Sequence, residues 1–379
     1  NSSPAFGPTS SRQASYRTML ELADDARRGE IDVLILNNTN PVFHMPEATR
    51  FEEALSKIPL IVSLSSFLDE TTALASLILP SHTYLESWGD DTPEPGVGFS
   101  VGSVSQPVVA PLYNTRATGD IILGLARGMG LDAEFPWSSM EDYQKEGWRK
   151  IYQRGSPDTT IETFESFWTA VVEAGVWGET TRGKQPSFTL DSSVIDDIAV
   201  AAPTFFGSDD EYPFVLHPYL SNALHDGRGA NLPWMQELPD PLTGVVYGSW
   251  VELNPTTAEK LKLREGDVVE LVSSTGRLAA PVFVYPAIMP NVVAMPIGQG
   301  HREFGRYARD RGANTIRILA SEVERKTGAL AWAATRVRLM PTGRRIDLVK
   351  VSGESRQLGR GIVQTATLGS STQPNGMPR

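Results

Sequence analysis

Short apolar runs alternate with helical stretches between about residues 15 and 130, and this alternation constrains the fold most. The helical stretch Tyr16–Arg28 stops at Gly29, and the apolar run Ile31–Leu36 ends in two asparagines, as a buried parallel strand would. Further helices are predicted over Arg50–Lys57 and Gly119–Gly130, and further strands over Leu60–Leu64 and Leu74–Leu79. The pattern predicts an α/β domain whose open, mostly parallel sheet is flanked by helices on both faces.

The chain from Tyr212 onward has a different pattern, in which Gly and Pro separate short β-rich runs. These runs are Val245–Leu253, Asp267–Ser273, Leu278–Tyr285 and Val292–Pro296, with one short helix over Thr256–Lys262. Together they predict a second domain that is a β-barrel. Two last strands, over Thr335–Met340 and Arg345–Val351, are expected to close it.

These patterns divide the chain into four parts. A flexible N-terminal segment covers residues 1–15, the α/β domain 16–208, the barrel 209–345, and a terminal strand with a flexible tail 346–379. Within the α/β domain, residues from about 131 to 208 are expected to form a helical insertion, with helices over Ser139–Tyr152 and Ile161–Ala174.

Charge and cysteine content exclude several classes of function. With 34 Lys and Arg against 45 Asp and Glu, the net charge is −11, which disfavours binding to nucleic acid phosphates. The given sequence has no cysteine, so it can hold neither a disulfide nor a Cys-ligated zinc or iron–sulfur site. Its five histidines lack metal-ligand spacing. Its longest apolar stretches, Ile58–Leu68 and Thr72–Leu79, are shorter than the roughly 20 residues that span a bilayer, so no membrane span is expected.

Three polar segments are candidate ligand sites. Asn37–Pro41 follows a predicted strand, where ligands of open α/β sheets bind, although a plain Asx turn would explain the asparagines equally well. Asp69–Thr71, with Glu86 further on, offers acids that could bind a polar ligand or cap a helix. Gly298–His301 combines glycines that allow close backbone approach with hydrogen-bonding Gln and His side chains, or is simply a tight barrel loop.

Six motifs, in the same order, resemble those of the molybdopterin oxidoreductase superfamily over roughly residues 16–320. The α/β part carries NNTNPVFHMP, FEEALSKIPLIVSLSSFLDETT and LILPSHTYLESWGD. The second part carries GANLPWMQELPDPLTG, SWVELNPTTAEKLKLREGDVVEL and VVAMPIGQGHREFGRYA. The resemblance implies that the barrel is a double-psi β-barrel.

One departure points to a particular branch of the superfamily. Where cofactor-bound members continue after LILP with Glu, Gly-Thr and an Asn-x-Glu-Gly-Arg stretch, this sequence has ESWGDDTPEPGVGFSVGSVSQPVVAPLYNTRA. That version is similar to the molybdopterin-like part of the large iron–sulfur subunit of bacterial alternative complex III, a quinol-oxidising membrane complex. The further half that supplies cluster cysteines and the molybdenum ligand in catalytic chains of the superfamily is expected to be missing here.

This resemblance implies a non-catalytic scaffold that positions redox partners for quinol oxidation and electron transport. The expected partners are a ferredoxin-like iron–sulfur part, a multihaem cytochrome c and integral membrane quinol-binding subunits, on the periplasmic side of the cytoplasmic membrane. The iron–sulfur clusters and haem c would belong to those partners, so this chain is expected to hold no cofactor. Its pterin pocket would be a relict, formed by Asn37, Asn40, Glu70, Thr71, Glu86, Gly298, Gln299, Gly300 and His301.

The superfamily also offers an alternative, in which the chain is the C-terminal half of a molybdenum catalytic subunit of polysulfide, thiosulfate or menaquinone reductase type. The same pocket residues would then hold molybdopterin guanine dinucleotide, with its pterin and phosphates against the backbone of Asn37–Asn40 and Gly298–Gly300. A free-standing small-molecule binding protein is the least supported of the three interpretations.

Overall fold

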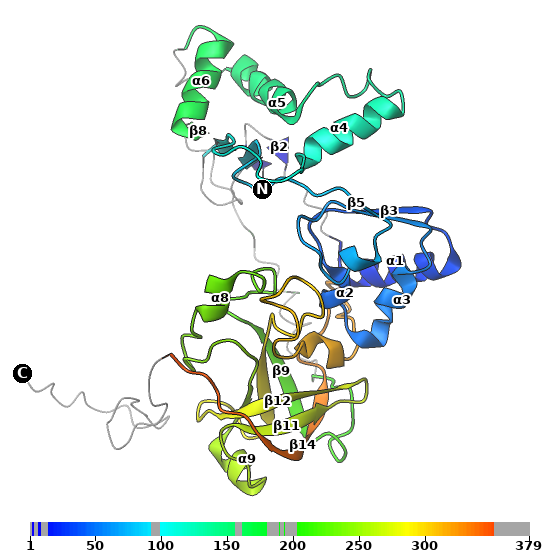
Figure 1. Ribbon diagram of the computed structural model, residues 1–379, viewed down its shortest axis with the longest axis vertical. Coiled ribbons are helices and arrows are strands. Elements are labelled where there is room, and N and C mark those ends of the chain that lie inside the picture. Colours follow the sequence, from blue (N-terminus) through cyan, green and yellow to red (C-terminus); the bar gives the residue numbers. More distant parts are fainter. Residues whose placement is uncertain are drawn as a thin grey trace, which may run out of the picture.

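The computed structural model describes residues 14–91, 99–155, 161–179 and 203–351, together with residues 2–3, 7–8, 189 and 193. Most of the predicted N-terminal segment and C-terminal tail lies outside these residues, although strands β1 (Ser2–Ser3) and β2 (Gly7–Pro8) pair within the former. Figure 1 shows a parallel sheet with helices, a second small sheet with helices, and a β-barrel. The mixed α/β class with a parallel sheet and a barrel is therefore confirmed, and the double-psi topology stays a prediction.

The parallel sheet has three strands in the order β3 (Val33–Leu36), β4 (Leu60–Ser63) and β5 (Leu77–Ile78). Helix α1 (Tyr16–Arg28) has the bounds that the sequence predicts, because Ser15 caps its first turn and Gly29, with a φ of +72°, ends it. The connections contain α2 (Pro41–His44), the 3-10 turn η1 (Glu47–Thr49), α3 (Phe51–Leu55) and the 3-10 turn η2 (Thr72–Leu74).

Helices α1 and α3 bury one face of this sheet, and Figure 1 shows both on the same side of the strands. Leu36 and Ile61 point into that apolar layer and are buried. On the opposite face, Val33, Ile35 and Leu77 are about half exposed. The prediction of helices on both faces is therefore confirmed for one face, and the other keeps exposed apolar side chains within the described part of the chain.

Residues between the parallel sheet and the barrel form a cluster of helices with an antiparallel sheet. Its elements are β6 (Gly89–Asp91), β7 (Val101–Ser105), α4 (Thr118–Gly128), α5 (Met140–Arg154), α6 (Phe164–Ala174) and β8 (Val176–Gly178). Trp148, Phe167 and Trp168 are buried in its core. The sequence predicts the helices but misses the strands, because strands this short carry almost no periodic signal. Much of the predicted insertion beyond Glu179 lies outside the described residues.

Six strands close the barrel. They are β9 (Phe214–Leu220), β10 (Val251–Leu253), β11 (Asp267–Val272), β12 (Arg277–Val284), β13 (Val292–Ile297) and β14 (Arg336–Arg345), in the order β10-β12-β11-β14-β9-β13. Between them lie α8 (Pro233–Glu237), α9 (Pro255–Lys260) and the 3-10 turn η3 (Thr315–Ile318). No helix within the described ranges is long and apolar enough to cross a lipid bilayer.

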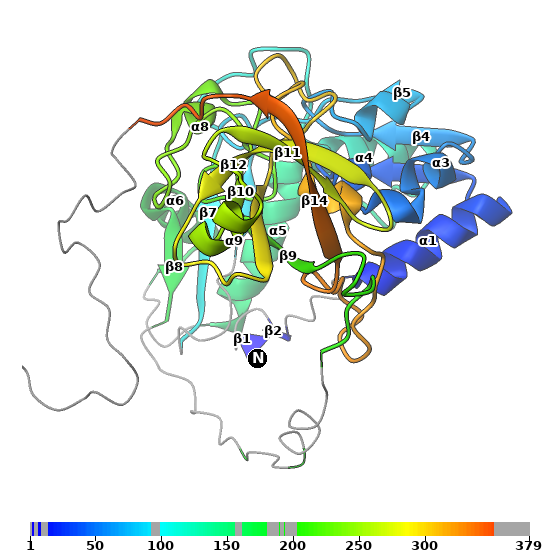
Figure 2. The same ribbon diagram turned by 90° about the horizontal axis from the view of Figure 1, so that it is seen from below.

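Two barrel strands differ from the prediction. Strand β9 is missed because Pro218 lies in its middle, and a proline argues against an interior strand. The predicted strand Thr335–Met340 is the first part of β14, which arches beside β11 in Figure 2. The predicted strand Arg345–Val351 is wrong, because it shares only Arg345 with β14 and continues as an irregular segment with one isolated bridge, from Lys350 to Val245. Residues of β14 beyond Pro341 are exposed, so the polar Thr342–Arg344 stretch continues the strand without a core-facing pattern.

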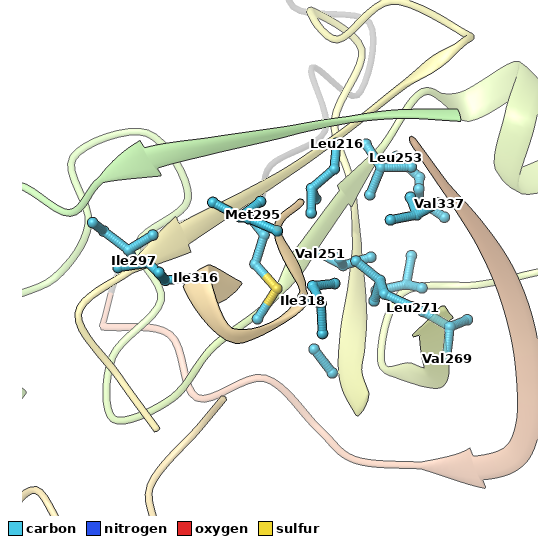
Figure 3. Close-up of a cluster of buried hydrophobic side chains, with 14 of the residues drawn as sticks. Leu216, Val251, Leu253, Val269, Leu271, Met295, Ile297, Ile316, Ile318 and Val337 are labelled. Carbon is cyan, nitrogen blue, oxygen red and sulfur yellow. The ribbon is translucent and has the colours of Figure 1, made fainter. Parts of the chain in front are cut away.

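The barrel interior is a continuous apolar core. Figure 3 shows Leu216, Val251, Leu253, Val269, Leu271 and Met295 converging there, and all six are fully buried. Ile318 of η3 closes the same cluster at 1% exposure.

Shortening Ile318 to valine should lower the free energy of unfolding by about 0.5–1.5 kcal/mol, because one buried methylene leaves a void that close packing cannot refill. The matched control is Ile346→Val, since Ile346 is 46% exposed and should change stability very little. Urea unfolding of both variants checks this, and equal losses at the two positions would contradict the assignment of Ile318 to the core.

Candidate functional site

The predicted polar segments meet where the parallel sheet contacts the barrel. Asn40 follows β3, Glu70 and Thr71 follow β4, and His301 follows β13. All four side chains are buried, and hydrogen bonds connect them into one network. The structure therefore joins by a hydrogen bond two residues, Glu70 and His301, that are 231 positions apart in the sequence.

Glu70 is the centre of this network. Its Oε2 accepts a hydrogen bond from Asn40 Nδ2 at 2.6 Å, and its Oε1 accepts one from the Arg302 amide at 2.7 Å. His301 Nδ1 lies 3.2 Å from both carboxylate oxygens. Burial raises the pKa of Glu70, but the hydrogen bond and charge of His301 and the hydrogen bond from Asn40 outweigh it and lower the pKa to about 2. Glu70 is therefore a buried carboxylate in its ionised form near neutral pH.

The side chains of Asn40 and Thr71 determine which groups of the network donate hydrogen bonds and which accept them. Asn40 Oδ1 accepts hydrogen bonds from the Thr71 amide at 3.2 Å and from Thr71 Oγ1 at 2.7 Å. Thr71 Oγ1 in turn accepts one from the Val42 amide at 3.0 Å. Backbone amides can only donate, so Asn40 must direct its NH₂ group at Glu70.

The His301 ring packs against two phenylalanines and keeps one nitrogen free. Phe43 stacks on it with 3.7 Å between ring centroids and 4° between ring planes, and the Phe304 centroid lies 5.0 Å away. The ring is 3% exposed, yet Nε2 has no hydrogen-bond partner among the described residues. A buried polar atom without a partner is costly, and such an atom in a native structure calls for an explanation.

A cavity of about 450 Å³ opens beside His301. It lies between the unit that contains the parallel sheet and the unit that contains the barrel. It is lined by Asn38, Thr39, Asn40, His44, Ser65, Phe67, Asp69, Asp226, Gly227, Arg228, His301 and Phe304. This volume lies in the range of small-molecule and cofactor sites, and the lining combines aromatic surface with converging polar groups.

Both signs of charge occur in this lining. Arg228 Nη2 lies 2.7 Å from Asp226 Oδ2. Burial raises the pKa of Asp226, but the hydrogen bonds from Arg228 outweigh it and hold that pKa below its usual range. Burial raises the pKa of Asp69, whose Oδ1 accepts a hydrogen bond from the Thr72 amide at 2.7 Å. Asp69 thus accepts a hydrogen bond from the first residue of η2, whose N-cap residue is Thr71, and it also lines the cavity.

Gly227 lies directly beside the free nitrogen. Its φ is +109°, and a Cβ atom added there would lie 2.9 Å from both His301 Nε2 and Phe43 Cε1. Glycine therefore allows the backbone to approach the imidazole closely, and any other residue would be strained and would crowd Nε2.

Several predicted residues are held by other contacts. Gln299 forms an amide pair with Gln236, with Nε2 of Gln299 donating to Oε1 of Gln236 at 2.8 Å. Glu86 accepts hydrogen bonds from the amides of Thr83 and Leu112, at 3.0 Å each, and does not line the cavity. Asn37 is exposed, and its Oδ1 accepts from Asn38. These three therefore belong to loop structure around the site.

The two flanking glycines of the barrel loop serve its tight turn. Gly298 and Gly300 have φ values of +107° and +91°. A Cβ atom on Gly300 would lie 2.1 Å from the Asn314 amide nitrogen, which is closer than non-bonded atoms can approach. The tight-loop explanation thus accounts for Gly300. The same loop places His301 in the lining of the cavity.

Sequence reasoning misses several residues of the site, including His44 and Phe67 of the cavity lining. Phe43, Asp226, Gly227, Arg228 and Phe304 line the cavity or contact the imidazole. In the sequence, the stretch His225–Arg228 is typical of a charged turn, and its Asp-Gly pair is the only feature that indicates a turn. Nothing in that stretch indicates contact with a loop more than 70 residues away.

Two family models match this chain. Residues 7–127 match the model described as Molybdopterin oxidoreductase, and residues 234–329 match the one described as Molydopterin dinucleotide binding domain. The second match runs from α8 to the segment before β14 and includes His301.

Curated relatives are similar along most of the chain. It is 29% identical over 308 residues to the menaquinone reductase molybdopterin-binding-like subunit of Nitratidesulfovibrio vulgaris. The aligned region covers 81% of this chain and 41% of the relative. It is 27% identical to the arsenate respiratory reductase molybdopterin-containing subunit of Shewanella sp. strain ANA-3, over 80% of this chain and 43% of the relative. A thiosulfate reductase molybdopterin-containing subunit of Salmonella typhimurium is 23% identical over 71% of this chain and 38% of the relative.

The fold is similar to that of acetylene hydratase from Pelobacter acetylenicus, with a TM-score of 0.64 and 18% sequence identity. That comparison covers 87% of this chain and 47% of the hydratase. The chain therefore spans less than half the length of the relatives that it matches here.

These matches correct one expectation. The prediction that this chain holds no cofactor is wrong, because residues 234–329 match a molydopterin dinucleotide binding domain and two of the matched relatives are molybdopterin-containing subunits of reductases. The residues present also fit such a group: the cavity is large, its lining is partly polar, and one lining residue, His301, has a buried ring nitrogen without a partner among the described residues. A relict pocket would be expected to collapse or to satisfy that nitrogen internally.

Proposed function

We propose, from its relationship to the molybdopterin oxidoreductase superfamily, that this chain is the cofactor-holding portion of a molybdopterin-dependent reductase subunit. The observation that carries the proposal is the cavity where the parallel sheet meets the barrel, whose lining includes His301 with its unpartnered Nε2. The relatives support this interpretation better than a non-catalytic scaffold in alternative complex III.

The cavity lining suggests how the chain would hold the cofactor. Arg228 offers a largely exposed guanidinium to a phosphate, a pairing in which arginine forms two parallel hydrogen bonds. Asn38 and Thr39 add side-chain donors and acceptors beyond the end of β3. When bound, the cofactor would supply the oxidation–reduction chemistry at its metal. Phe43 and Phe304 would exclude water from the imidazole that faces it.

Electron-transfer partners are part of the proposal, since a chain without cysteine has no thiolate to hold a cluster of its own. The matched relatives are subunits of reductases, which is consistent with a chain that works in an assembly. We propose iron–sulfur and haem-bearing partners, a quinone-type electron carrier, and a position on the exported side of the membrane. The open apolar face of the parallel sheet is one surface available for such contacts.

Metal and pterin content of the native assembly tests the proposed function. We expect about one molybdenum or tungsten and one pterin dinucleotide for each copy of this chain, measured by elemental analysis and by fluorescence of the oxidatively released pterin. An assembly that contains iron but no molybdenum, tungsten or pterin would overturn the proposal and would favour a non-catalytic scaffold instead. The same measurement on a His301→Asn assembly shows whether retained cofactor depends on this site.

A further inference from the structure

We propose that Glu70 is a positioning residue that fixes the tautomer of His301, so that the lone pair of Nε2 is what a ligand in the cavity meets. The identity of that ligand rests on the proposed function, whereas the tautomer itself does not. The ligand class that this arrangement selects is one that presents an N–H or O–H group to the imidazole.

The polarity of the network leads to this tautomer. The Val42 and Thr71 amides can only donate, so Asn40 must present Oδ1 to Thr71 and its NH₂ group to Glu70. The Arg302 amide also donates to Glu70. An ionised carboxylate can only accept, so the nitrogen of His301 at 3.2 Å must be Nδ1–H.

Packing prevents the ring from exchanging its two nitrogens. Turning the imidazole over would sweep its edge through the Phe43 ring, which lies parallel to it with 3.7 Å between centroids. Phe304, 5.0 Å away and tilted by 36°, confines the ring further. Nε2 is therefore held beside Gly227, where a Cβ atom would lie only 2.9 Å from it.

The neutral ring then has one arrangement of its hydrogen. With Nδ1 protonated, Nε2 carries a lone pair and accepts a hydrogen bond from the ligand. The nitrogen is buried and has no partner among the described side chains, so a ligand donor would satisfy an atom that the fold leaves unsatisfied. A ring N–H or amino group of a heteroaromatic ligand meets this requirement.

Glu70→Gln separates positioning from packing. A glutamine has nearly the same shape, but one of its two terminal atoms is an NH₂ group. Asn40 and Arg302 each donate to a different oxygen of Glu70, so the glutamine NH₂ group faces a donor wherever it points. Of these three neighbours only His301 can offer that NH₂ group an acceptor, by presenting Nδ1 without its hydrogen, which then moves to Nε2.

The test is nitrogen NMR of the full chain labelled with ¹⁵N-histidine, without added cofactor. The pH is raised until the ring shifts stop changing, and His301 is identified among the five histidines by its loss in His301→Asn. We expect protonated Nδ1 and unprotonated Nε2 in the natural chain, and the reverse in Glu70→Gln. The matched control is Glu324→Gln, since Glu324 also has a pKa lowered to about 2, by loop hydrogen bonds from Thr327.

Protonated Nε2 in the natural chain would overturn the proposal, as would an unchanged tautomer in a folded Glu70→Gln chain. If Glu70→Gln does not fold, the spectrum of the natural chain still decides the tautomer. Because no cofactor is present, this result is independent of the metal and pterin content. If the chain has the expected tautomer but the native assembly contains no pterin, the proposed function is wrong and the assignment of the tautomer still holds.

Discussion

Replacing Glu70 with alanine should lower the free energy of unfolding by about 3–5 kcal/mol, the cost of breaking a buried charged pair by removing one partner. The carboxylate accepts hydrogen bonds from Asn40, His301 and Arg302, and their donors would be left buried without an acceptor. Because Glu70 belongs to the sheet unit and His301 to the barrel unit, the loss should appear as weaker docking of the two units.

Urea unfolding of the natural chain and Glu70→Ala measures this effect, with Glu324→Ala as control. Glu324 is an exposed loop carboxylate, so its removal should change stability far less. Equal effects at the two positions would contradict the role assigned to Glu70.

The same carboxylate predicts a dependence on pH. The folded-state pKa of Glu70, about 2, lies below its ordinary value of 4.5, so its contribution is present above pH 4.5 and is lost as pH falls toward 2. The stability difference between the natural chain and Glu70→Ala should therefore narrow by up to roughly 3 kcal/mol over that window. A difference that stays constant from pH 5 to pH 2.5 would show that folding does not lower the pKa of Glu70.

Replacing Gly227 with alanine should weaken cofactor retention by roughly 5- to 150-fold. The added methyl group would lie against His301 Nε2 and Phe43, and overpacking of this kind costs about 1–3 kcal/mol. It would also occupy the space through which a ligand reaches the nitrogen. The readout is pterin released per chain from the assembled variant, together with its thermal unfolding.

Gly305→Ala is the matched control for this prediction. Gly305 also has a positive φ, +81°, but a Cβ atom there would meet nothing within 4 Å. Both variants therefore carry backbone strain, and only Gly227→Ala crowds the imidazole. Equal loss of pterin in the two variants would show that strain in the loops, and not access to His301, controls retention.

Local pattern was sufficient for much of the fold. The capping serine and terminal glycine of α1 lie beside the residues that they affect, so the sequence predicts its bounds correctly. The apolar runs of β3, β4, β11, β12 and β13 also carry their own periodicity. Strand β9 was lost because Pro218 is tolerated through its pairing in the barrel, and pairing partners are not visible locally.

The sequence by itself determined which segments are polar, where they follow strands, and that no thiolate chemistry occurs in this chain. Only the tertiary structure decided which members of those segments meet: Asn40, Glu70, Thr71 and His301 form one network, whereas Asn37, Glu86 and Gln299 are used elsewhere. The physical reason is that a hydrogen bond between residues 231 positions apart depends on the docking of two units, and docking leaves no periodic trace in either segment.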